Sequence, residues 1–293
     1  MLCPLCHHTQ SRMFHVEHRP RNREYRQCAH CQLVFVPARF HLNETDEQAE
    51  YALHENHFSD VGYHRFLGKA TQALATVLTN NPPTWFCVLP DSRHTPWSEF
   101  DRDLTSNDIA DSFRYYCQTL GLEDNPSSLT PQHALDFIDF LQLTDLPTPH
   151  TTQTRISALD FGCGPMPALA TQLSTLGCDV QVFDKYFFSD ASPLAQHYDI
   201  ITCTEVIEHV AEAHTVWTKL VGMLKPDGLL LVMTKRVLNA KRFATWHYKN
   251  DPTHICFYHE VTAHYLAQHF NLELQLPTSD IMLFKRKTTP AKQ

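Results

Sequence analysis

Four cysteines near the N-terminus restrict the fold of that segment more than any other feature of the chain. They form two Cys-x-x-Cys pairs, Cys3 with Cys6 and Cys28 with Cys31, and 21 residues separate the pairs. Each pair offers two thiolates from one tight turn, and two such turns can surround one tetrahedral metal ion. A segment of about 40 residues buries too little apolar surface to fold unaided. We therefore expect residues 1–40 to be a zinc ribbon with a structural Zn²⁺, an iron–sulfur centre or free thiols being the alternatives.

Composition excludes several classes of protein. The chain has 293 residues, of which 43% are hydrophobic and 19% are charged, so it can bury one large core or two smaller ones. No apolar run approaches the roughly 18 residues of a membrane span, and the first residues lack a signal-peptide pattern. Ten cysteines without such a signal favour a reducing compartment. We expect a cytoplasmic protein with no membrane partner.

Charge differs strongly between segments. Residues 1–40 carry six arginines against two glutamates, whereas residues 41–150 carry 5 basic and 17 acidic side chains. Acidic surfaces repel polyanions, so any RNA contact would fall on the arginines of residues 12–39. Solvated arginines without a partner are the alternative. The acidic residues 81–150 could bind a protein partner, cover an active site or be a surface appendage.

Strands alternate with helices from residue 156 onward, which predicts an α/β, doubly wound, Rossmann-like sheet with a binding crevice at the strand carboxyl ends. Helices are expected earlier, within 44–80, 104–120 and 130–143. The later strands are expected at 156–161, 180–183, 200–202, 229–234, 272–276 and 281–285. The later helices are expected at 167–176, 211–224 and 260–270, with a turn at 225–228.

A nucleoside site is indicated where the first of these strands ends. Asp160, Gly162 and Gly164 form a D-x-G-x-G sequence, and Asp184 ends the next strand 20 residues later. Glycines let the backbone approach a ligand closely, and a carboxylate at that distance can accept ribose hydroxyls. A dinucleotide would want glycine where Pro167 stands, and Asp160 would repel its pyrophosphate. The pattern favours S-adenosylmethionine, which is cationic and carries no phosphate, over NAD; an ordinary strand–turn–helix is the alternative.

Residues 156–285 resemble class I S-adenosylmethionine-dependent methyltransferases. The Glu-Val-Ile-Glu-His run at 205–209 is similar to that of quinol and related small-molecule methylases, and the segment 251–258 recurs in that group. Chains with an N-terminal double Cys-x-x-Cys ribbon look closest, and nucleotide-sugar C-methyltransferases share a similar layout. The matching segments are 159–165, 182–184, 198–201, 204–209 and 224–228.

The resemblance implies a domain plan and a cofactor site. It implies a zinc ribbon at 1–40, a helical lead-in at 41–80, a mainly helical insertion and linker at 81–155, and a methyltransferase core at 156–293. Only 14 residues separate Asp184 from Asp199, so the usual third strand with its adenine contact is shortened or absent. The cofactor-binding residues that it implies are Asp160, Gly162, Cys163 and Gly164 at the methionine end, Asp184 at the ribose, and Thr204 and Glu205 at the rim.

Candidates for a general base or an acceptor-orienting group follow the fourth strand of the core. They are His254, Tyr258 and Asp251, with His209 and Glu205 as second choices. Alignment of the acceptor with the methyl group supplies most of the acceleration, and a base adds roughly 10²–10⁴-fold. Alternatively, the Asp-Pro-Thr sequence at 251–253 only turns the chain, and His254 packs in the core.

These features predict S-adenosylmethionine-dependent methyl transfer to a small-molecule biosynthetic intermediate, for which a nucleotide-linked sugar is one class. One alternative is an RNA methyltransferase that uses the basic ribbon as its reader, although a net charge of −8 argues against it. The other is a non-catalytic binding protein with a cofactor fold, against which the intact Asp160 and Asp184 argue.

Overall fold

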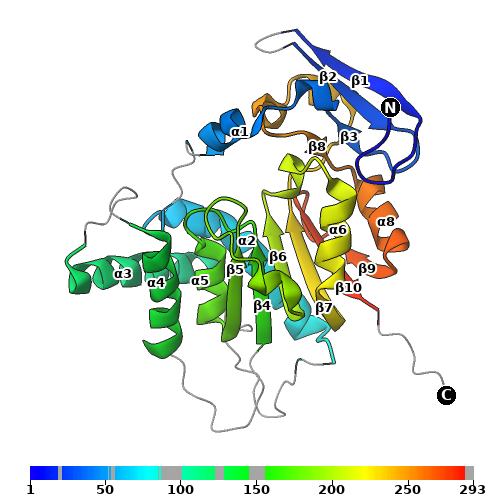
Figure 1. The fold of residues 1–293 in the computed structure, drawn as a ribbon. Coiled ribbons are helices and arrows are strands. Elements are labelled where there is room, and N and C mark those ends of the chain that lie inside the picture. Colours follow the sequence, from blue (N-terminus) through cyan, green and yellow to red (C-terminus); the bar gives the residue numbers. More distant parts are fainter. Residues whose placement is uncertain are drawn as a thin grey trace, which may run out of the picture. The chain divides into compact units, whose positions relative to one another are not determined.

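The structure is a computed structural model (Figure 1). It describes residues 1–18, 22–51, 53, 57–84, 86, 101–122, 129–144 and 156–287. Arg19 and Arg21 of the basic segment, and parts of the expected 81–150 insertion, therefore lie outside the described residues. The chain divides into two compact units. Unit 1 comprises Met1–His54, Thr204–Gly222 and Val232–Gln293, and unit 2 comprises Glu55–Cys203 and Met223–Leu231.

Unit 2 is built on parallel strands. The central strand β4 (Ile156–Phe161) pairs in parallel with β5 (Cys178–Phe183) on one side and with β6 (Tyr198–Thr204) on the other. These strands are short runs rich in Ile, Val and Phe, and their buried faces suit a sheet covered by helices. Only the short 3₁₀ helix η3 (Ser192–Ala195) separates β5 from β6, and β5 is the edge of its sheet. The expected loss of the usual third strand is confirmed.

Four helices of unit 2 pack on one another. Asp60 caps α2 (Val61–Asn80) by accepting the backbone N–H of Tyr63, and Gly121, with φ 66°, ends α3 (Arg102–Leu120). The side chain of Gln172 joins α5 to α2, because its amide donates to the carbonyl of His64. The remaining helices are α4 (Pro131–Thr144) and α5 (Ala168–Thr175).

The next strand starts earlier than the sequence pattern predicts. The Lys-Pro-Asp-Gly sequence at 225–228 was expected to be a turn, but strand β7 already begins at Leu224 and runs to Met233. The strand is kinked at this sequence, because Asp227 has a φ of 64° within it. Its buried carboxylate accepts the backbone N–H of Thr84. The full sheet has the order β5-β4-β6-β7-β10-β9 and is mixed but mostly parallel, so the expected α/β fold is confirmed.

Unit 1 combines the N-terminal segment with the C-terminal part of the chain. The strands β1 (Ser11–Glu17), β2 (Arg23–Cys28) and β3 (Val34–Phe35) form an antiparallel sheet, and β8 (Cys256–Phe257) adds the fourth strand beside β3. The N-terminal sheet is therefore completed by residues from the far end of the sequence.

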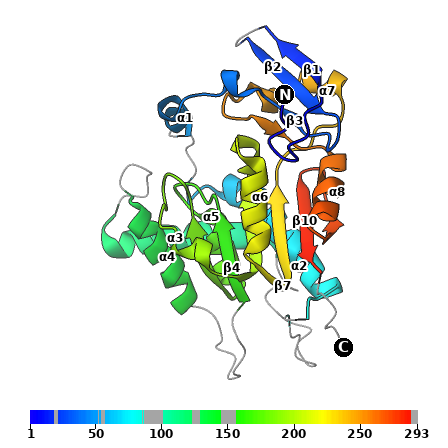
Figure 2. The same cartoon turned by 45° about the vertical axis from the view of Figure 1, so that its right-hand side comes forward.

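The remaining elements of unit 1 surround this sheet and the end of β7. Strands β9 (Leu272–Gln275) and β10 (Ile281–Arg286) pair antiparallel. Within the part of the chain that is described, none of the helices has the length and apolar character of a membrane span. The helices are α1 (Glu44–Tyr51), α6 (Ala213–Gly222), α7 (Ala240–Ala244) and α8 (Glu260–His269), with 3₁₀ turns η1 (Ala38–Phe40), η4 (Ile207–His209) and η5 (His247–Asn250) (Figure 2).

Candidate functional site

The loop after β4 carries the glycines that the sequence singled out. Gly162 and Gly164 have φ values of 76° and 69°, in the left-handed region that glycine adopts without strain. The N–H of Gly162 donates to the carbonyl of Phe183 at 2.7 Å, and the N–H of Gly164 donates to Asp184 at 3.0 Å. A side chain added at Gly164 would point into open space. The backbone is thus bent next to room for a ligand, and Asp184 holds the bend.

The carboxylate of Asp184 also stabilises the backbone around it. One of its oxygens accepts the Gly164 N–H, and the other accepts the N–H groups of Tyr186 and Phe187. These bonds hold the carboxylate in one orientation beside the end of β5. Its remaining acceptor capacity could serve vicinal hydroxyls such as those of a ribose.

Asp160 is a buried carboxylate at the end of the central strand. It is only 2% exposed, and its Oδ1 accepts the hydroxyl of Thr202 at 2.9 Å. Burial, together with the nearby negative charge of Asp184, raises the pKa of Asp160 to about 7, although hydrogen bonds from Thr202 and the backbone of Ala170 oppose the shift. A carboxylate in such a place is stabilised by a cation next to it. A positively charged ligand therefore suits this loop, whereas a phosphate does not.

Cys163 lies between the two glycines, and its thiol is buried. Burial raises its pKa well above the ordinary value, and the carboxylates of Asp160 and Asp184 act in the same direction. The thiol is thus neutral at physiological pH and is suited to packing rather than to nucleophilic attack.

In unit 1, Glu205 begins a cluster of acidic and aromatic groups. Thr204 ends β6, and Glu205 follows with φ 53°, a conformation that costs a residue other than glycine about 1 kcal/mol or more. The hydroxyl of Tyr248 lies 3.1 Å from Glu205 and also donates to Glu208 in a short hydrogen bond. The Thr234 hydroxyl lies 3.1 Å from the same oxygen of Tyr248. One phenol thus joins two carboxylates.

Glu208 is the most perturbed acid of this cluster. It is fully buried, and its Oε2 has no hydrogen-bond partner among the described residues. Burial, together with the nearby charge of Glu205, raises the pKa of Glu208 to about 8. The hydrogen bond from Tyr248 opposes this shift. A carboxyl group that titrates in this range can accept or donate a proton near neutral pH.

His254 packs against the same phenol. Its Nδ1 lies 2.6 Å from the backbone carbonyl of Tyr248, so Nδ1 carries the hydrogen, and its Nε2 lies 3.7 Å from Asp251. The imidazole contacts the rings of Tyr248 and His209, with centroids 4.2 and 4.6 Å away. Ligand atoms of Glu208, His209 and His254 lie within 4.8 Å of one another, so these three side chains could hold a metal ion.

A comparison with known families matches residues 131–276 to a family described as a methyltransferase domain. The chain contains a class I S-adenosylmethionine-dependent methyltransferase domain. The ubiquinone biosynthesis O-methyltransferase of Salmonella paratyphi A is 29% identical over 79 residues, which cover 27% of this chain and 33% of that protein. The Yersinia enterocolitica enzyme of the same name is 28% identical over 80 residues. The chain thus spans about a third of the length of these curated relatives.

Solved structures with a similar arrangement are also methyltransferases. An O-methyltransferase family protein from Burkholderia thailandensis has a TM-score of 0.35 and 13% identity, covering 78% of this chain and 72% of its own. Human N-acetylserotonin methyltransferase, solved in complex with S-adenosylmethionine, has a TM-score of 0.36 and 17% identity, covering 63% of this chain and 67% of its own. Both likenesses are weak.

Asp251 and Tyr258, the other two residues expected to be catalytic, lie in different surroundings from each other. Asp251 turns the chain, because it accepts the backbone N–H of Thr253 at 2.8 Å. Burial raises its pKa, but the field of His254 and the bonds from Thr253 outweigh this and hold the pKa below its ordinary value. Tyr258 is fully buried, and its hydroxyl accepts the indole N–H of Trp217 at 3.0 Å. The structure thus brings Asp251 to His254, and it places Tyr258 in the core.

Two residues of this cluster escaped the sequence-based selection. Glu208 follows two apolar residues, Val206 and Ile207, in the sequence. A carboxylate in such a place can be buried, and this signal could have marked Glu208 as a candidate. Tyr248 gave no signal, because it lies in a 3₁₀ turn that belongs to no recognised motif.

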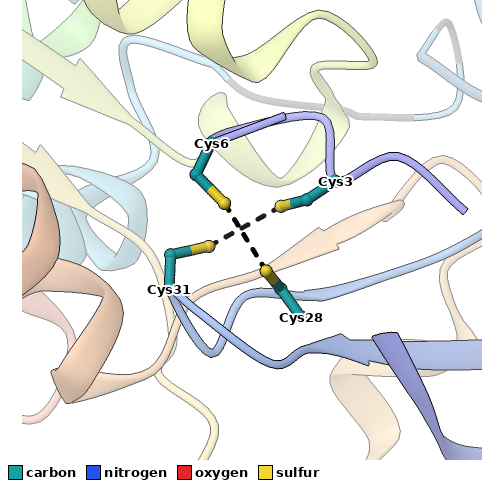
Figure 3. Close-up of side chains that lie close together, drawn as sticks. All are labelled: Cys3, Cys6, Cys28 and Cys31. Carbon is teal, nitrogen blue, oxygen red and sulfur yellow. Dashed lines mark hydrogen bonds between the residues drawn. The ribbon is translucent and has the colours of Figure 1, made fainter. Parts of the chain in front are cut away.

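The four N-terminal cysteines of the chain meet at one point (Figure 3). The sulfur atoms of Cys3 and Cys31 are 3.6 Å apart, and those of Cys6 and Cys28 are 3.5 Å apart. A tetrahedral zinc with Zn–S bonds of about 2.3 Å requires sulfur atoms about 3.8 Å apart. Burial raises the pKa of Cys6 to about 12, whereas the hydrogen bond with Cys31 lowers the pKa of Cys3 to about 5. The donor set and its spacing fit Zn²⁺.

The backbone around these cysteines repeats the same local geometry twice. His7 and Gln32, each directly after the second cysteine of its pair, have φ values of 57° and 61°. The N–H of His30 also points at the sulfur of Cys28, at 3.4 Å. The pairs are thus two equivalent turns that present their sulfur atoms to a common centre.

Proposed function

We propose that the protein transfers the methyl group of S-adenosylmethionine to a small-molecule acceptor. The single observation that carries this proposal is the buried carboxylate of Asp160 beside the open glycine turn. Asp160 would face the cationic methionine end, Gly162, Cys163 and Gly164 would line it with backbone, and Asp184 would accept ribose hydroxyls. Thr204 and Glu205 would lie at the rim of the cofactor site. The sulfonium group, when bound, supplies an activated methyl group.

The acid–base part of the reaction is assigned to the cluster around Tyr248. Glu208, with its pKa raised to about 8, would accept a proton from the acceptor, and Tyr248 would hold it in place. His254 would orient the acceptor through Nε2, because Nδ1 is engaged by the Tyr248 carbonyl. Asp251, whose carboxylate lies 3.7 Å from that Nε2, would hold the imidazole in place. Tyr258 is the weakest member of the expected set, since its hydroxyl serves Trp217.

The N-terminal site is assigned a structural role. Cys3, Cys6, Cys28 and Cys31 would fill all four positions of a Zn²⁺ ion, which leaves none for a substrate. The metal would stabilise a sheet whose own apolar content is small.

Contacts of the arginines weaken the RNA alternative. Arg23 is buried and donates to the carbonyls of residues 251, 252 and 254, and Arg12 donates to Gln27. Arg26 donates to Ser11, and Arg39 pairs with Glu24. These guanidinium groups hold the sheet together and are poorly placed to read a phosphate backbone.

The proposal is tested by S-adenosylmethionine binding to the metal-loaded full-length chain, measured by calorimetry, with Asp160→Asn as the variant. The wild type should bind the cofactor, and the variant should bind it at least about tenfold more weakly, since a charge-assisted contact is lost. Cofactor carrying a labelled methyl group should then label a small molecule of a cell extract. Absence of cofactor binding by the wild type would refute the proposal, and binding without any labelling would favour a non-catalytic protein.

A further inference from the structure

A cavity of about 760 Å³ lies within unit 1. Its walls come mainly from the chain that follows β7 and from α7, the short helix labelled in Figure 2, and they also include Ser279 and Asp280. A volume of this size is typical of sites for small molecules and cofactors. All of the lining residues belong to the same compact unit as Tyr248 and Glu208.

The lining is cationic although the chain as a whole carries a net charge of −8. Four basic side chains face one carboxylate, that of Asp280; they are Lys235, Arg236, Lys241 and Arg242. Within the described part of the chain, neither Lys241 nor Arg242 forms an ion pair, and Lys235 also lacks one. The carboxylates of Asp280 and Glu260 act on Arg236, but they are outnumbered by the four cations. Like charges in excess repel one another, and an anionic ligand would relieve this repulsion.

Two of these cations are held in place by the fold. The guanidinium of Arg236 donates to the carbonyls of Ile281 at 3.0 Å and Thr278 at 2.7 Å. The ammonium of Lys235 lies 3.5 Å from Nε2 of His247 and 5.2 Å from the centre of the Tyr248 ring. Lys241 and Arg242 are exposed and remain free to reach toward a ligand. The cavity thus combines fixed and adjustable positive charges.

An apolar wall accompanies the charges. Trp246 is half-buried, and its ring packs against those of Phe243 and Tyr248, with centroids 5.9 and 5.1 Å away. Leu238, which is 61% exposed, belongs to the same lining. A supported indole next to cations favours a ligand that has a flat ring as well as a negative charge.

The cavity adjoins the acid–base cluster through one residue. Lys235 covers the ring of Tyr248, and the hydroxyl of that ring contacts Glu205 and Glu208. We propose that this cavity binds the methyl acceptor, and that the acceptor is a small molecule that joins a phosphate or pyrophosphate group to a flat ring, as a nucleoside diphosphate derivative does. This inference rests on the proposed function and deepens it. A concave site of this volume suits a small molecule better than an RNA strand, which needs an extended groove.

Calorimetry on the metal-loaded full-length chain tests the charge requirement, with uridine diphosphate, pyrophosphate and uridine as probes. Uridine diphosphate should bind, and uridine should bind at least about tenfold more weakly. Arg242→Glu should lower the affinity for uridine diphosphate by about tenfold or more. Lys219→Glu is the matched control, because it makes the same charge change on the exposed side of α6, outside the cavity, and should leave the affinity unchanged.

A second variant distinguishes the contribution of the ligand's ring to binding from that of its phosphates. Trp246→Leu should lower the affinity for uridine diphosphate by about tenfold, because a stack between the base and the indole is lost. The affinity for pyrophosphate should not change. Retained pyrophosphate binding also shows that the variant is folded. Equal weakening of both probes would overturn the assignment of the ring to Trp246.

Binding of S-adenosylmethionine is measured on the same samples, so that the two proposals fail separately. If the cofactor binds but none of the phosphate probes does, or if Lys219→Glu weakens binding as much as Arg242→Glu, the cavity proposal is wrong and the proposed function stands. If a single-stranded RNA oligomer displaces uridine diphosphate and binds more tightly, the ligand class is wrong. If the cofactor fails to bind, the proposed function itself is refuted.

Discussion

Arg23 donates a hydrogen bond from Nη2 to the backbone carbonyl of His254, at 2.9 Å and across 231 residues of sequence. The same guanidinium reaches the carbonyls of Asp251 and Pro252. The β2 strand of the cysteine-bearing sheet therefore fixes the loop that carries the candidate catalytic histidine. Lys249, buried and paired with Glu17, makes a second connection of this kind.

Replacement of Arg23 should destabilise the protein and disturb that loop. Arg23→Met leaves one buried and two partly buried carbonyls without their donor, and we expect a loss of about 3 kcal/mol in the free energy of unfolding. Chemical denaturation measures it. The control is Arg39→Met, which removes the exposed pair with Glu24 and should cost less than about 1 kcal/mol. Equal effects of the two replacements would contradict the assigned role of Arg23.

Removal of the metal should affect more than the N-terminal sheet. Cys28→Ser should release the bound zinc, found as about one equivalent per chain by elemental analysis of the wild type. Because β8 and the 251–254 loop are bonded to that sheet, the variant should also lose most methyl transfer. Cys117→Ala, a buried cysteine of α3, is the control and should keep the metal. A wild-type protein purified without metal would argue against the site.

Cofactor affinity should depend on pH through Asp160. Its pKa in the folded protein is raised to about 7 from an ordinary value of 3.8, so the free protein is most stable below pH 4 with respect to this group. That contribution is lost as the pH rises from about 4 to 7. The ionised form attracts the cationic cofactor, so affinity should fall by up to tenfold per pH unit below 7.

Calorimetry between pH 5.5 and 8.5 measures this dependence. Asp160→Asn cannot ionise, and its weaker affinity should show no such slope. A wild-type affinity that stays constant across this range would show that Asp160 does not face the positive charge.

Glu208 should titrate far above an ordinary carboxyl group. Carbon NMR of glutamate-labelled protein should show one carboxyl with a pKa of about 8, and this signal should vanish in Glu208→Gln. The Tyr248 hydrogen bond lowers the pKa of Glu208, so Tyr248→Phe should raise it further. A signal for Glu208 near the usual value of 4.5 would remove the basis for its role as a proton acceptor.

The conformation of the loop after β4 followed from the sequence, because its causes lie within a few residues of one another or at the end of the next strand. Gly162 and Gly164 adopt the left-handed conformations that a tight turn after a strand requires, and Asp184 closes the turn at the end of the next strand. The clustering of the four cysteines followed from their spacing in the same way. Burial of His254 also agrees with the alternative in which it packs in the core.

Contacts between distant segments could not be predicted in this way. The pairing of Phe35 with Cys256 joins two-residue strands whose sequences carry no signal for each other. The place of Tyr248 between two carboxylates depends on the path of an irregular segment after β7. The strand β7 begins at Leu224, ahead of the Pro-Asp-Gly sequence, and Asp227 of that sequence contacts the backbone of Thr84, which is 143 residues away.

The shared sheet of β3 and β8 also orders events during synthesis. The cysteine turns leave the ribosome long before the strand and the carbonyls that complete their scaffold. Until then Val34 and Phe35 lack the pairing that β8 supplies. The N-terminal sheet therefore reaches its four-stranded form only together with the C-terminal part of unit 1.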